Sequence, residues 1–375
     1  MIKKIAVLRA NALGDFIFIL PALQALKDSF PGVEIVLLGK PWHQEYLNNR
    51  PSNVDRVVVV PPYPGVGAAY DYQVDEAQLN QFFAEMQAEN FDLAFQFHGG
   101  GKNSNPFMLR LGAKKVIGLK SPVAPEVDVS VPYVLYHSEP MRYLEMVALA
   151  GAKTLSIEPH WEAVPGDLTE LEQVLPDWKN QKLIVIHSGA TDMRRRWPAK
   201  KFAAVADDLI KSGFTIAITG TDFEKEVIKE VWENISQKQH AFDLCNQLSL
   251  AGMTGLLSVS KLVIANDTGP IHLARALKTP TVGIFWCSNA ITGAPFTVMQ
   301  NRTLISFMVD CPICGQRVIS PTAIFPPKGD CHHQTCFVEE ITVKQVLDSA
   351  QDLLLQTGNW PENVPVEPID FVNFY

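Results

Sequence analysis

The stretch KLVIANDTGPIHLARAL, residues 261–277, decides the fold class of this chain. Residues 261–265 predict a buried strand, and Pro270, which follows small and polar residues, predicts the start of a helix over 270–277. A buried strand that runs through a glycine-containing turn into a helix is typical of a parallel sheet with helices on both faces. The turn leaves backbone N–H groups unpaired at the positive end of the helix dipole, so it also predicts an anion site suited to a diphosphate.

The same alternation extends along the chain from this stretch in two series. In the first series we expect strands at Ile5–Leu8, Val33–Leu38, Val57–Val60, Leu93–Phe97 and Lys115–Gly118, and helices at Ala22–Ser29, Glu76–Ala88 and Met141–Leu149. In the second we expect strands at Leu183–His187, Thr215–Thr219, Lys261–Ala265 and Thr281–Phe285, and helices at Lys200–Lys211, Glu224–Ile235 and Pro270–Leu277. The sequence therefore predicts an α/β protein with two Rossmann-like, doubly wound domains that face a central cleft, where ligands bind beyond the carboxyl ends of the strands.

The domain boundaries follow from the places where the alternation stops. We expect an N-terminal domain over 1–165, a C-terminal domain over 180–340, and a C-terminal helix and tail over 341–375. This C-terminal helix and tail could pack back on the N-terminal domain. The tail from Trp360 onward is rich in proline and aromatic residues, and we expect it to pack irregularly against a domain surface.

Composition narrows the class of protein. The chain has 375 residues, of which 47% are hydrophobic, and this is enough for about two domains. Its net charge of −8 argues against a dedicated nucleic-acid-binding protein, which usually carries a basic surface. The apolar residues 5–8 and 16–26 are too short or too interrupted for a signal peptide or a membrane span. We expect a soluble, cytoplasmic protein and leave peripheral contact with the inner membrane open.

Three turns of the second series carry candidate ligand-binding residues. In the turn after 261–265, Asp267 and His272 could hold hydroxyl groups of a ribose or a sugar. The turn after Leu183–His187 contains Thr191 and a run of three arginines that includes Arg195, and arginine pairs well with phosphate. The third turn ends at Glu224, a candidate acceptor of ribose hydrogen bonds. Structural interpretations remain open beside these: helix caps at Asp267 and Thr268, a core histidine at His272, and surface charge at the arginines and Glu224.

The first turn of the chain, RANALGD at 9–15, differs from a dinucleotide-binding fingerprint because Gly14 is its only glycine. A nicotinamide site is therefore disfavoured. Asp15 lies where a strand passes into a helix, at the edge where ligands bind. Two roles remain open for it, helix capping and catalysis.

Together these residues resemble the heptosyltransferase family that builds the inner core of lipopolysaccharide. The resemblance covers roughly residues 1–355 in order, and Asp267-Thr-Gly-Pro-x-His272-x-Ala274 is its most specific part. It also rests on the first turn with Arg9, Leu13, Gly14 and Asp15, on Thr191, Arg195, Trp197 and Pro198, and on Gly220 and Glu224. Arg195 stands where lysine is common in the family.

The resemblance implies the two-domain GT-B fold and an inverting transfer that requires no metal or other cofactor. By analogy the donor would be a nucleotide sugar of the ADP-heptose class, and the acceptor a saccharide or glycolipid such as lipopolysaccharide core. By the same analogy, Asp15 is the general base that takes the acceptor proton. Thr191, Arg195 and the amides of Thr268 and Gly269 hold the leaving diphosphate. The side chains of Glu224, Asp267 and His272 orient the ribose and the sugar.

Two segments depart from the family pattern. The first is the glycine-rich segment 98–105, HGGGKNSN, where Lys102 is the candidate contact for an anionic acceptor and a surface loop is the alternative. Basic residues are few there, which puts a heavily phosphorylated acceptor in doubt. The second is a cysteine cluster. Cys311, Cys314, Cys331 and Cys336 have spacing that resembles a structural zinc site, with a reduced loop or a disulfide as alternatives. No catalytic metal is expected.

Two other functions remain open from the sequence. One is a nucleotide-sugar epimerase on the same fold, which needs a second acid/base pair that the sequence does not single out. The other is a catalytically silent protein that binds a nucleotide sugar.

Overall fold

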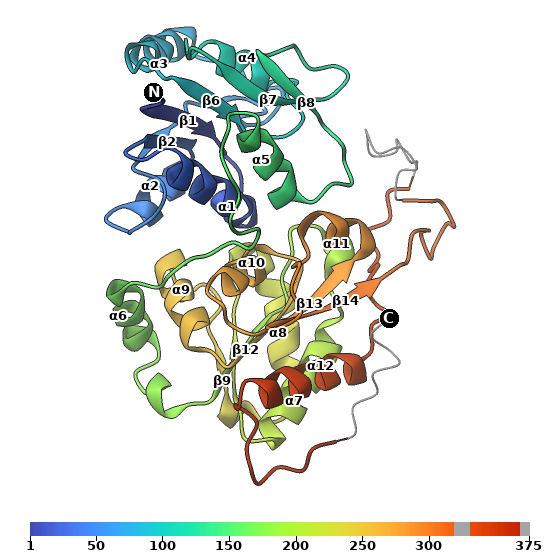
Figure 1. Ribbon diagram of the computed structural model, residues 1–375. Helices are drawn as coiled ribbons and strands as arrows, with labels where there is room; N and C mark the ends of the chain where they lie inside the picture. Colours follow the sequence, from blue (N-terminus) through green and yellow to red (C-terminus); the bar gives the residue numbers. More distant parts are fainter. Residues whose placement is uncertain (319–330, 368–375) are drawn as a thin grey trace. The chain divides into compact units, whose positions relative to one another are not determined.

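The computed structural model describes residues 1–318 and 331–367, which form two compact units (Figure 1). The described residues of the first unit are 1–159, and those of the second are 160–318 and 331–367. Each unit is built on its own six-stranded sheet, and every strand pair in both sheets is parallel.

The sheet of the first unit has the order β3-β2-β1-β6-β7-β8. Its strands are β1 (Lys4–Leu8), β2 (Glu34–Gly39), β3 (Arg56–Val59), β6 (Leu93–Gln96), β7 (Val116–Lys120) and β8 (Val129–Pro132), and β4 (Tyr63–Pro64) and β5 (Gly67–Ala68) form a separate short pair. The helices are α1 (Leu13–Ser29), α2 (Pro41–Leu47), α3 (Glu76–Ala88), α4 (Ser104–Leu109) and α5 (Glu139–Ala148). Alternate residues of β1 point to opposite faces, so that Ala6 and Leu8 join the core cluster that holds α3 and α4.

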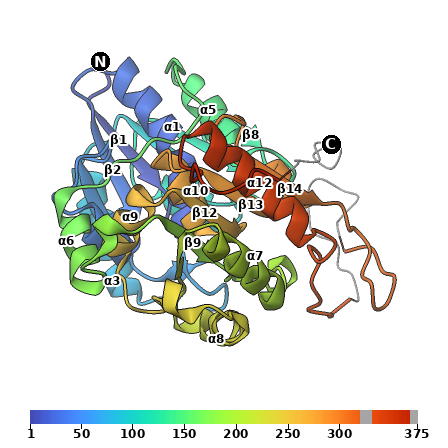
Figure 2. The same cartoon turned by 90° about the horizontal axis from the view of Figure 1, so that it is seen from below.

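The sheet of the second unit repeats this topology in the order β11-β10-β9-β12-β13-β14. Its strands are β9 (Leu183–His187), β10 (Thr215–Ile218), β11 (Ala241–Asp243), β12 (Leu262–Asn266), β13 (Thr281–Trp286) and β14 (Asn301–Ser306). The helices are α6 (Pro165–Val174), α7 (Ala199–Lys211), α8 (Lys225–Asn234), α9 (Leu250–Val259), α10 (Gly269–Ala276), α11 (Cys287–Gly293) and α12 (Val343–Gln356). Helix α7 contacts α8 and α12, whereas α9 contacts α6 and α10, so helices cover both faces (Figure 2).

Both sheets therefore have the Rossmann strand order, in which the first strand lies between the second and the fourth long strand. The prediction of an α/β fold with two Rossmann-like sheets is confirmed. The burial of the strands explains why the sequence pattern is informative: β1, β2, β9, β10, β12 and β13 consist almost entirely of buried apolar residues.

The structure differs from the expected elements, for example in one helix that is longer and one strand that is added. Helix α1 begins at Leu13, well before the expected start at Ala22, and continues through Pro21. Strand β14 is an addition to the expected strands, because its sequence NRTLIS is mostly polar and edge strands need little apolar surface. No helix among the described residues is long and apolar enough to cross a membrane.

The C-terminal helix α12 packs on α7, β13 and β14 of the second unit (Figures 1 and 2). Val346, Ala350, Leu353 and Leu354 place it in the core of that unit. The described part of the tail stays with the same unit: the ring of Trp360 lies 6.1 Å from that of Phe214, and Gln351 bonds the backbone of Glu367. The rest of the expected tail, 368–375, lies outside the described residues.

Candidate functional site

The strand order of each sheet fixes where its ligand-binding edge lies. Consecutive crossovers leave the sheet in opposite directions at the switch point, which lies between β1 and β6 in the first unit and between β9 and β12 in the second. A crevice forms beyond the carboxyl ends of the strands at such a point. The residues that follow these four strands begin with Arg9, Phe97, Ser188 and Asp267, so the turns after β1, β9 and β12, which the sequence singles out, lie at the switch points.

Asp267 is the centre of the turn between β12 and α10. One carboxylate oxygen, Oδ1, accepts a hydrogen bond from Nε2 of His272 at 2.9 Å, and Oδ2 is paired with Nη1 of Arg195 at 2.8 Å. The side chain is 8% exposed. Burial alone would raise the pKa of Asp267, but the His272 hydrogen bond and the Arg195 charge outweigh it and lower that pKa. The turn thus holds an ionised carboxylate between two cationic or hydrogen-bond-donating side chains.

The structure also shows how this turn is held, through a residue that the sequence pattern does not single out. Asn266 is fully buried, and its Nδ2 donates to the carbonyl oxygen of Ser188 at 2.8 Å. Its Oδ1 accepts from the backbone N–H of Trp197 at 3.0 Å. Asn266 therefore joins the turns that follow β9 and β12. A polar residue at the end of a buried strand is the sequence signal that could have identified it.

Two buried hydroxyl groups lie in these turns without a partner. Neither Ser188 Oγ nor Thr268 Oγ1 has a hydrogen-bond partner within the described residues. Thr268 precedes the first residue of α10, yet its side chain bonds no backbone N–H of that helix, so the capping interpretation of Thr268 is not supported. Because buried polar groups in proteins are normally hydrogen-bonded, each unpartnered one calls for an explanation, and an absent ligand is one.

The three arginines after β9 have different surroundings. Arg194 is paired with Asp192 through Nη2 at 2.6 Å, and Arg196 Nε donates to the carbonyl oxygen of Ala190 at 2.7 Å. Arg195 reaches Asp267 and remains 21% exposed. Thr191 is exposed in the same segment. Of the three arginines, Arg195 is thus the one that joins the Asp267 turn, and it is also the one that the family resemblance selects.

The carboxylate of Glu224 forms hydrogen bonds within its own turn. Its Oε2 accepts from the backbone N–H and the hydroxyl group of Thr221 at 2.9 and 3.0 Å, and its Oε1 lies 3.4 Å from His187 Nε2. Burial raises the pKa of Glu224, but the bond with His187 and the bonds with Thr221 outweigh burial and lower it to about 2. The surface-charge interpretation is therefore wrong for Glu224: it is a largely buried, ionised group at the edge of β9 and β10.

In the first unit, Asp15 both caps α1 and pairs with a buried arginine. Its Oδ2 accepts from Ala12 N–H at 3.1 Å, and its Oδ1 lies 2.6 Å from Nη2 of Arg9. Arg9 also bonds the carbonyl oxygen of Phe97 and lies 3.2 Å from Oε2 of Glu139. Burial would lower the pKa of Arg9, but Tyr143, Asp15 and Glu139 raise it, so the guanidinium stays charged. The Asp15 side chain remains 35% exposed, so capping leaves it accessible.

The segment 98–105 is tightly bound to the sheet. His98 Nδ1 accepts from Ala10 N–H at 3.3 Å, and its Nε2 donates to the carbonyl oxygen of Gly65 at 2.9 Å. Gly101 has a φ of +87°, and a Cβ there would lie 2.3 Å from the carbonyl oxygen of Leu119. These contacts require glycine at 101. Lys102 itself is exposed on this ordered turn, and its role as an acceptor contact stays a prediction.

The expected ligand set of the cysteine cluster is wrong at one position. Cys311, Cys314 and Cys331 do come together, but the fourth group is His333, and the four ligand atoms lie within 4.8 Å of one another. Cys336 is not part of this group.

Comparison with known proteins gives the family. The family model of glycosyltransferase family 9 (heptosyltransferase) matches residues 80–311. The chain is 23% identical over 294 residues to lipooligosaccharide heptosyltransferase 2 of Haemophilus ducreyi, covering 74% of this chain and 81% of that protein. It is 26% identical over 302 residues to lipopolysaccharide heptosyltransferase 1 of Campylobacter coli, covering 75% of this chain and 83% of that protein.

Solved structures share the fold. A family 9 glycosyltransferase from Veillonella parvula superposes with a TM-score of 0.74 at 20% identity, covering 94% of this chain and 98% of that one. The ADP-heptose lipopolysaccharide heptosyltransferase II of Escherichia coli gives 0.71 at 18% identity, covering 95% and 99%. The chain is thus a glycosyltransferase with the GT-B fold. It belongs to glycosyltransferase family 9, the heptosyltransferase family.

Proposed function

We propose that this enzyme transfers a heptose from ADP-heptose to a saccharide or glycolipid acceptor of the lipopolysaccharide-core class, with inversion at the anomeric carbon and without a catalytic metal. The similar Escherichia coli protein is an ADP-heptose lipopolysaccharide heptosyltransferase, and the relatives from Haemophilus ducreyi and Campylobacter coli are lipooligosaccharide and lipopolysaccharide heptosyltransferases. These names support the choice of donor and acceptor. For a lipid-linked acceptor, we place the enzyme at the cytoplasmic face of the inner membrane, in peripheral contact with it.

The observation that carries the donor site is the joined pair of turns at the β9/β12 switch point. Arg195, the N-terminus of α10 at Gly269 and the unpartnered hydroxyls of Ser188 and Thr268 supply a positive charge and hydrogen-bond donors in one place. A leaving diphosphate develops negative charge as the anomeric bond breaks, and pre-placed donors stabilise that charge. Such donors take the place of a metal ion in this proposal.

The same turns offer acceptors for hydroxyl groups. Thr191 is exposed beside Arg195 and would bind a phosphate oxygen. Glu224, Asp267 and His272 would orient the ribose and the heptose, with Asp267 and His272 acting as the hydrogen-bonded pair that the structure contains. Ionised carboxylates accept strong hydrogen bonds from hydroxyl groups, which suits the charge state of both acidic residues.

For the acceptor, Asp15 is the general base. An acceptor alcohol is a weak nucleophile until its proton is removed, and a carboxylate within hydrogen-bond reach provides that step. Arg9 fixes the Asp15 carboxylate through a 2.6 Å contact and is itself fixed by Glu139 and the Phe97 carbonyl. Lys102 would meet an anionic group of the acceptor.

The test is calorimetry with ADP, UDP, GDP and their sugars, followed by an assay for nucleoside diphosphate released in the presence of acceptor. Selective binding of adenine diphosphates together with acceptor-dependent release is the expected result. Tight binding without release on any acceptor would favour a catalytically silent binding protein. Interconversion of the sugar without an acceptor would favour an epimerase.

A further inference from the structure

The segment 309–318 forms a tight hairpin that presents two cysteines. Val318 N–H donates to the carbonyl oxygen of Val309 at 2.9 Å. Cys311 N–H donates to the carbonyl oxygen of Gln316, and the carbonyl oxygen of Cys311 accepts from Gly315 N–H, each at 2.8 Å. Gly315 has a φ of +71°, the left-handed conformation that glycine adopts without strain. This turn brings the sulfur atoms of Cys311 and Cys314 within 4.8 Å of each other.

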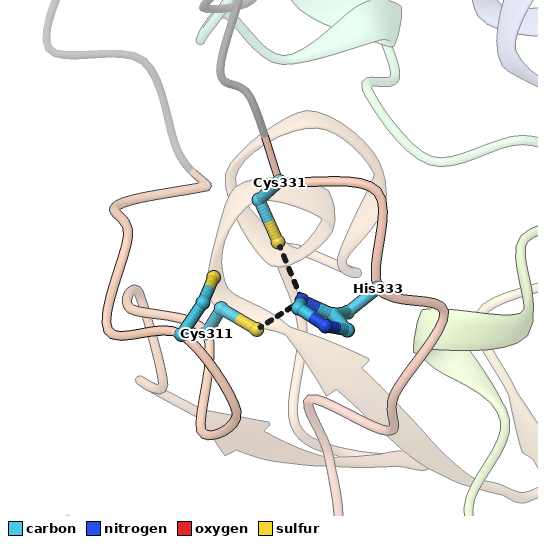
Figure 3. A group of neighbouring side chains, drawn as sticks. Cys311, Cys331 and His333 are labelled. Atoms are coloured by element: carbon cyan, nitrogen blue, oxygen red, sulfur yellow. Dashed lines mark hydrogen bonds between the residues drawn. The ribbon is translucent and has the colours of Figure 1, made fainter.

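Cys331 and His333 reach this hairpin from a distant part of the chain (Figure 3). The Sγ atoms of Cys311 and Cys331 lie 3.7 and 3.6 Å from the same atom, Nδ1 of His333. An imidazole nitrogen has either one lone pair or one proton, so it cannot form a full hydrogen bond with two thiols. The convergence of both sulfur atoms on one nitrogen therefore calls for another explanation.

A metal ion explains the convergence. Tetrahedral zinc, with Zn–S bonds of about 2.3 Å and a Zn–N bond of about 2.0–2.1 Å, separates a sulfur and a nitrogen ligand by roughly 3.6 Å. The two observed sulfur–nitrogen distances have this value, and Cys314 completes the set within 4.8 Å. Three cysteines and one histidine are a closed ligand set for structural zinc, with no position left for a substrate.

The segment of chain that follows the cluster supports the segment that carries Arg195. Phe337 N–H donates to the carbonyl oxygen of Arg194 at 2.8 Å, and the Phe337 ring lies 4.7 Å from that of Trp286. Farther along, the carbonyl oxygen of Ile341 accepts from Nε1 of Trp197 at 2.9 Å. The segment 192–197, which carries Arg195, is therefore held by the residues directly after the cluster.

We infer that Cys311, Cys314, Cys331 and His333 bind one structural zinc ion, and that this ion holds residues 331–341 against the segment that positions Arg195. The second part of this inference rests on the proposed donor site. When Arg195 is already held in place, diphosphate binding costs less conformational entropy. Loss of the ion should therefore weaken donor binding, although the ion itself does not contact the donor.

The first experiment measures metal in protein without a histidine tag, purified from cells grown with trace zinc, iron, cobalt and nickel. We expect about one zinc per chain in the wild type. His333→Gln and Cys314→Ser should lose the metal. The matched controls are His332→Gln, which changes the adjacent histidine, and Cys336→Ser, and both should keep it. A metal-free wild type, stoichiometric iron in place of zinc, or loss of zinc in Cys336→Ser but not in His333→Gln would overturn the assignment.

The second experiment measures ADP binding by calorimetry in the same variants. His333→Gln and Cys314→Ser should bind ADP at least about tenfold more weakly, which corresponds to roughly 1.4 kcal/mol, while His332→Gln binds it as the wild type does. Circular dichroism of each variant checks that the sheets remain folded. Zinc loss with unchanged ADP binding would overturn the supporting role and leave the proposed function intact. A zinc-loaded wild type that binds no nucleotide would overturn the proposed function and leave the metal site intact.

Discussion

Arg195 and Asp267 lie 72 residues apart in the chain, yet Nη1 of Arg195 contacts both the carbonyl oxygen and the Oδ2 atom of Asp267, at 3.2 and 2.8 Å. The contact joins the turn after β9 to the turn after β12 across the switch point of the second sheet. Because Asp267 also accepts from His272, the charge of the carboxylate is shared between two partners. Both contacts of Arg195 use Nη1, and a guanidinium has five N–H donors, so Arg195 keeps hydrogen-bonding capacity for a phosphate group.

Replacing Arg195 by alanine should weaken binding of the nucleoside diphosphate. A hydrogen bond to a charged group contributes about 1.5–3 kcal/mol, so we expect an increase in Kd of about 10- to 150-fold, measured by calorimetry. Arg195→Lys should recover part of the affinity, because it restores the charge without the planar fork. Lys200→Ala removes the same charge from an exposed position nearby and should leave Kd nearly unchanged. Equal losses in Arg195→Ala and Lys200→Ala would mean that only overall charge matters.

Replacing Asp15 by asparagine should slow turnover strongly and spare donor binding. Asparagine keeps one of the two oxygens and can still accept from Ala12 N–H, so the first turn of α1 should stay folded, while the bond from Arg9 to the other oxygen is lost. General-base catalysis contributes about 10²- to 10⁴-fold, and we expect kcat to fall by that range in an assay of released diphosphate. Asp28→Asn, an equivalent change at an exposed position of the same helix, is the control. A fully active Asp15→Asn variant would rule out the base assignment.

Replacing Gly189 by alanine should disturb Glu224. A Cβ at 189 would lie 1.9 Å from Oε1 of Glu224, so the carboxylate must leave the position in which Oε1 lies 3.4 Å from Nε2 of His187. Overpacking of this kind costs typically about 1–3 kcal/mol in the free energy of unfolding. We expect a lower midpoint of thermal unfolding and weaker nucleotide binding.

Gly166→Ala provides the matched control for this substitution, since a Cβ there meets nothing within 4 Å. It lies in the first turn of α6, where alanine favours the helix, so its stability should be unchanged or slightly higher. If both alanine variants behave alike, Glu224 is not held by the close approach at Gly189.

The fold is predictable from the sequence because both sheets are buried on two faces. Strands such as Leu183–His187 are continuous apolar runs, and the sequence predicts this strand with its observed bounds. The turns are predictable for a related reason, because the glycine and proline at 269 and 270 mark the start of α10. What the sequence does not predict depends on contacts between distant residues.

Three residues show where sequence reasoning ends. Glu139 contacts Arg9 although the two residues lie 130 positions apart, and no local sequence pattern predicts this contact. Asn266 looks like an ordinary turn residue until its bonds to Ser188 and Trp197 are seen. His333 replaces Cys336 in the group of four candidate metal ligands, because cysteine spacing does not give the path of the chain between the cysteines. Pairings of this kind follow from the tertiary fold.

The stability of the first unit should depend on pH through two buried histidines. Burial lowers the pKa of His43 from 6.5 to about 3, although the hydrogen bond with the Lys40 backbone opposes this shift. Burial and then the Arg9 charge lower the pKa of His98 to about 4. Between pH 6.5 and about 4, the unfolded chain therefore binds protons that the folded chain does not. The free energy of unfolding must fall as the pH falls through this range.

The slope contributed by each histidine is at most about 1.4 kcal/mol per pH unit. His43→Asn tests it, because His43 Nδ1 accepts from Lys40 N–H at 3.0 Å and its Nε2 has no partner within the described part of the chain. Asparagine can keep the one bond and cannot titrate. Urea unfolding between about pH 7 and pH 5 should show a smaller loss of stability in His43→Asn than in the wild type. His160→Asn, which changes an exposed histidine, should retain the wild-type slope. An unchanged slope in His43→Asn would mean that His43 is protonated in the folded protein over this range, against the burial that the structure gives it.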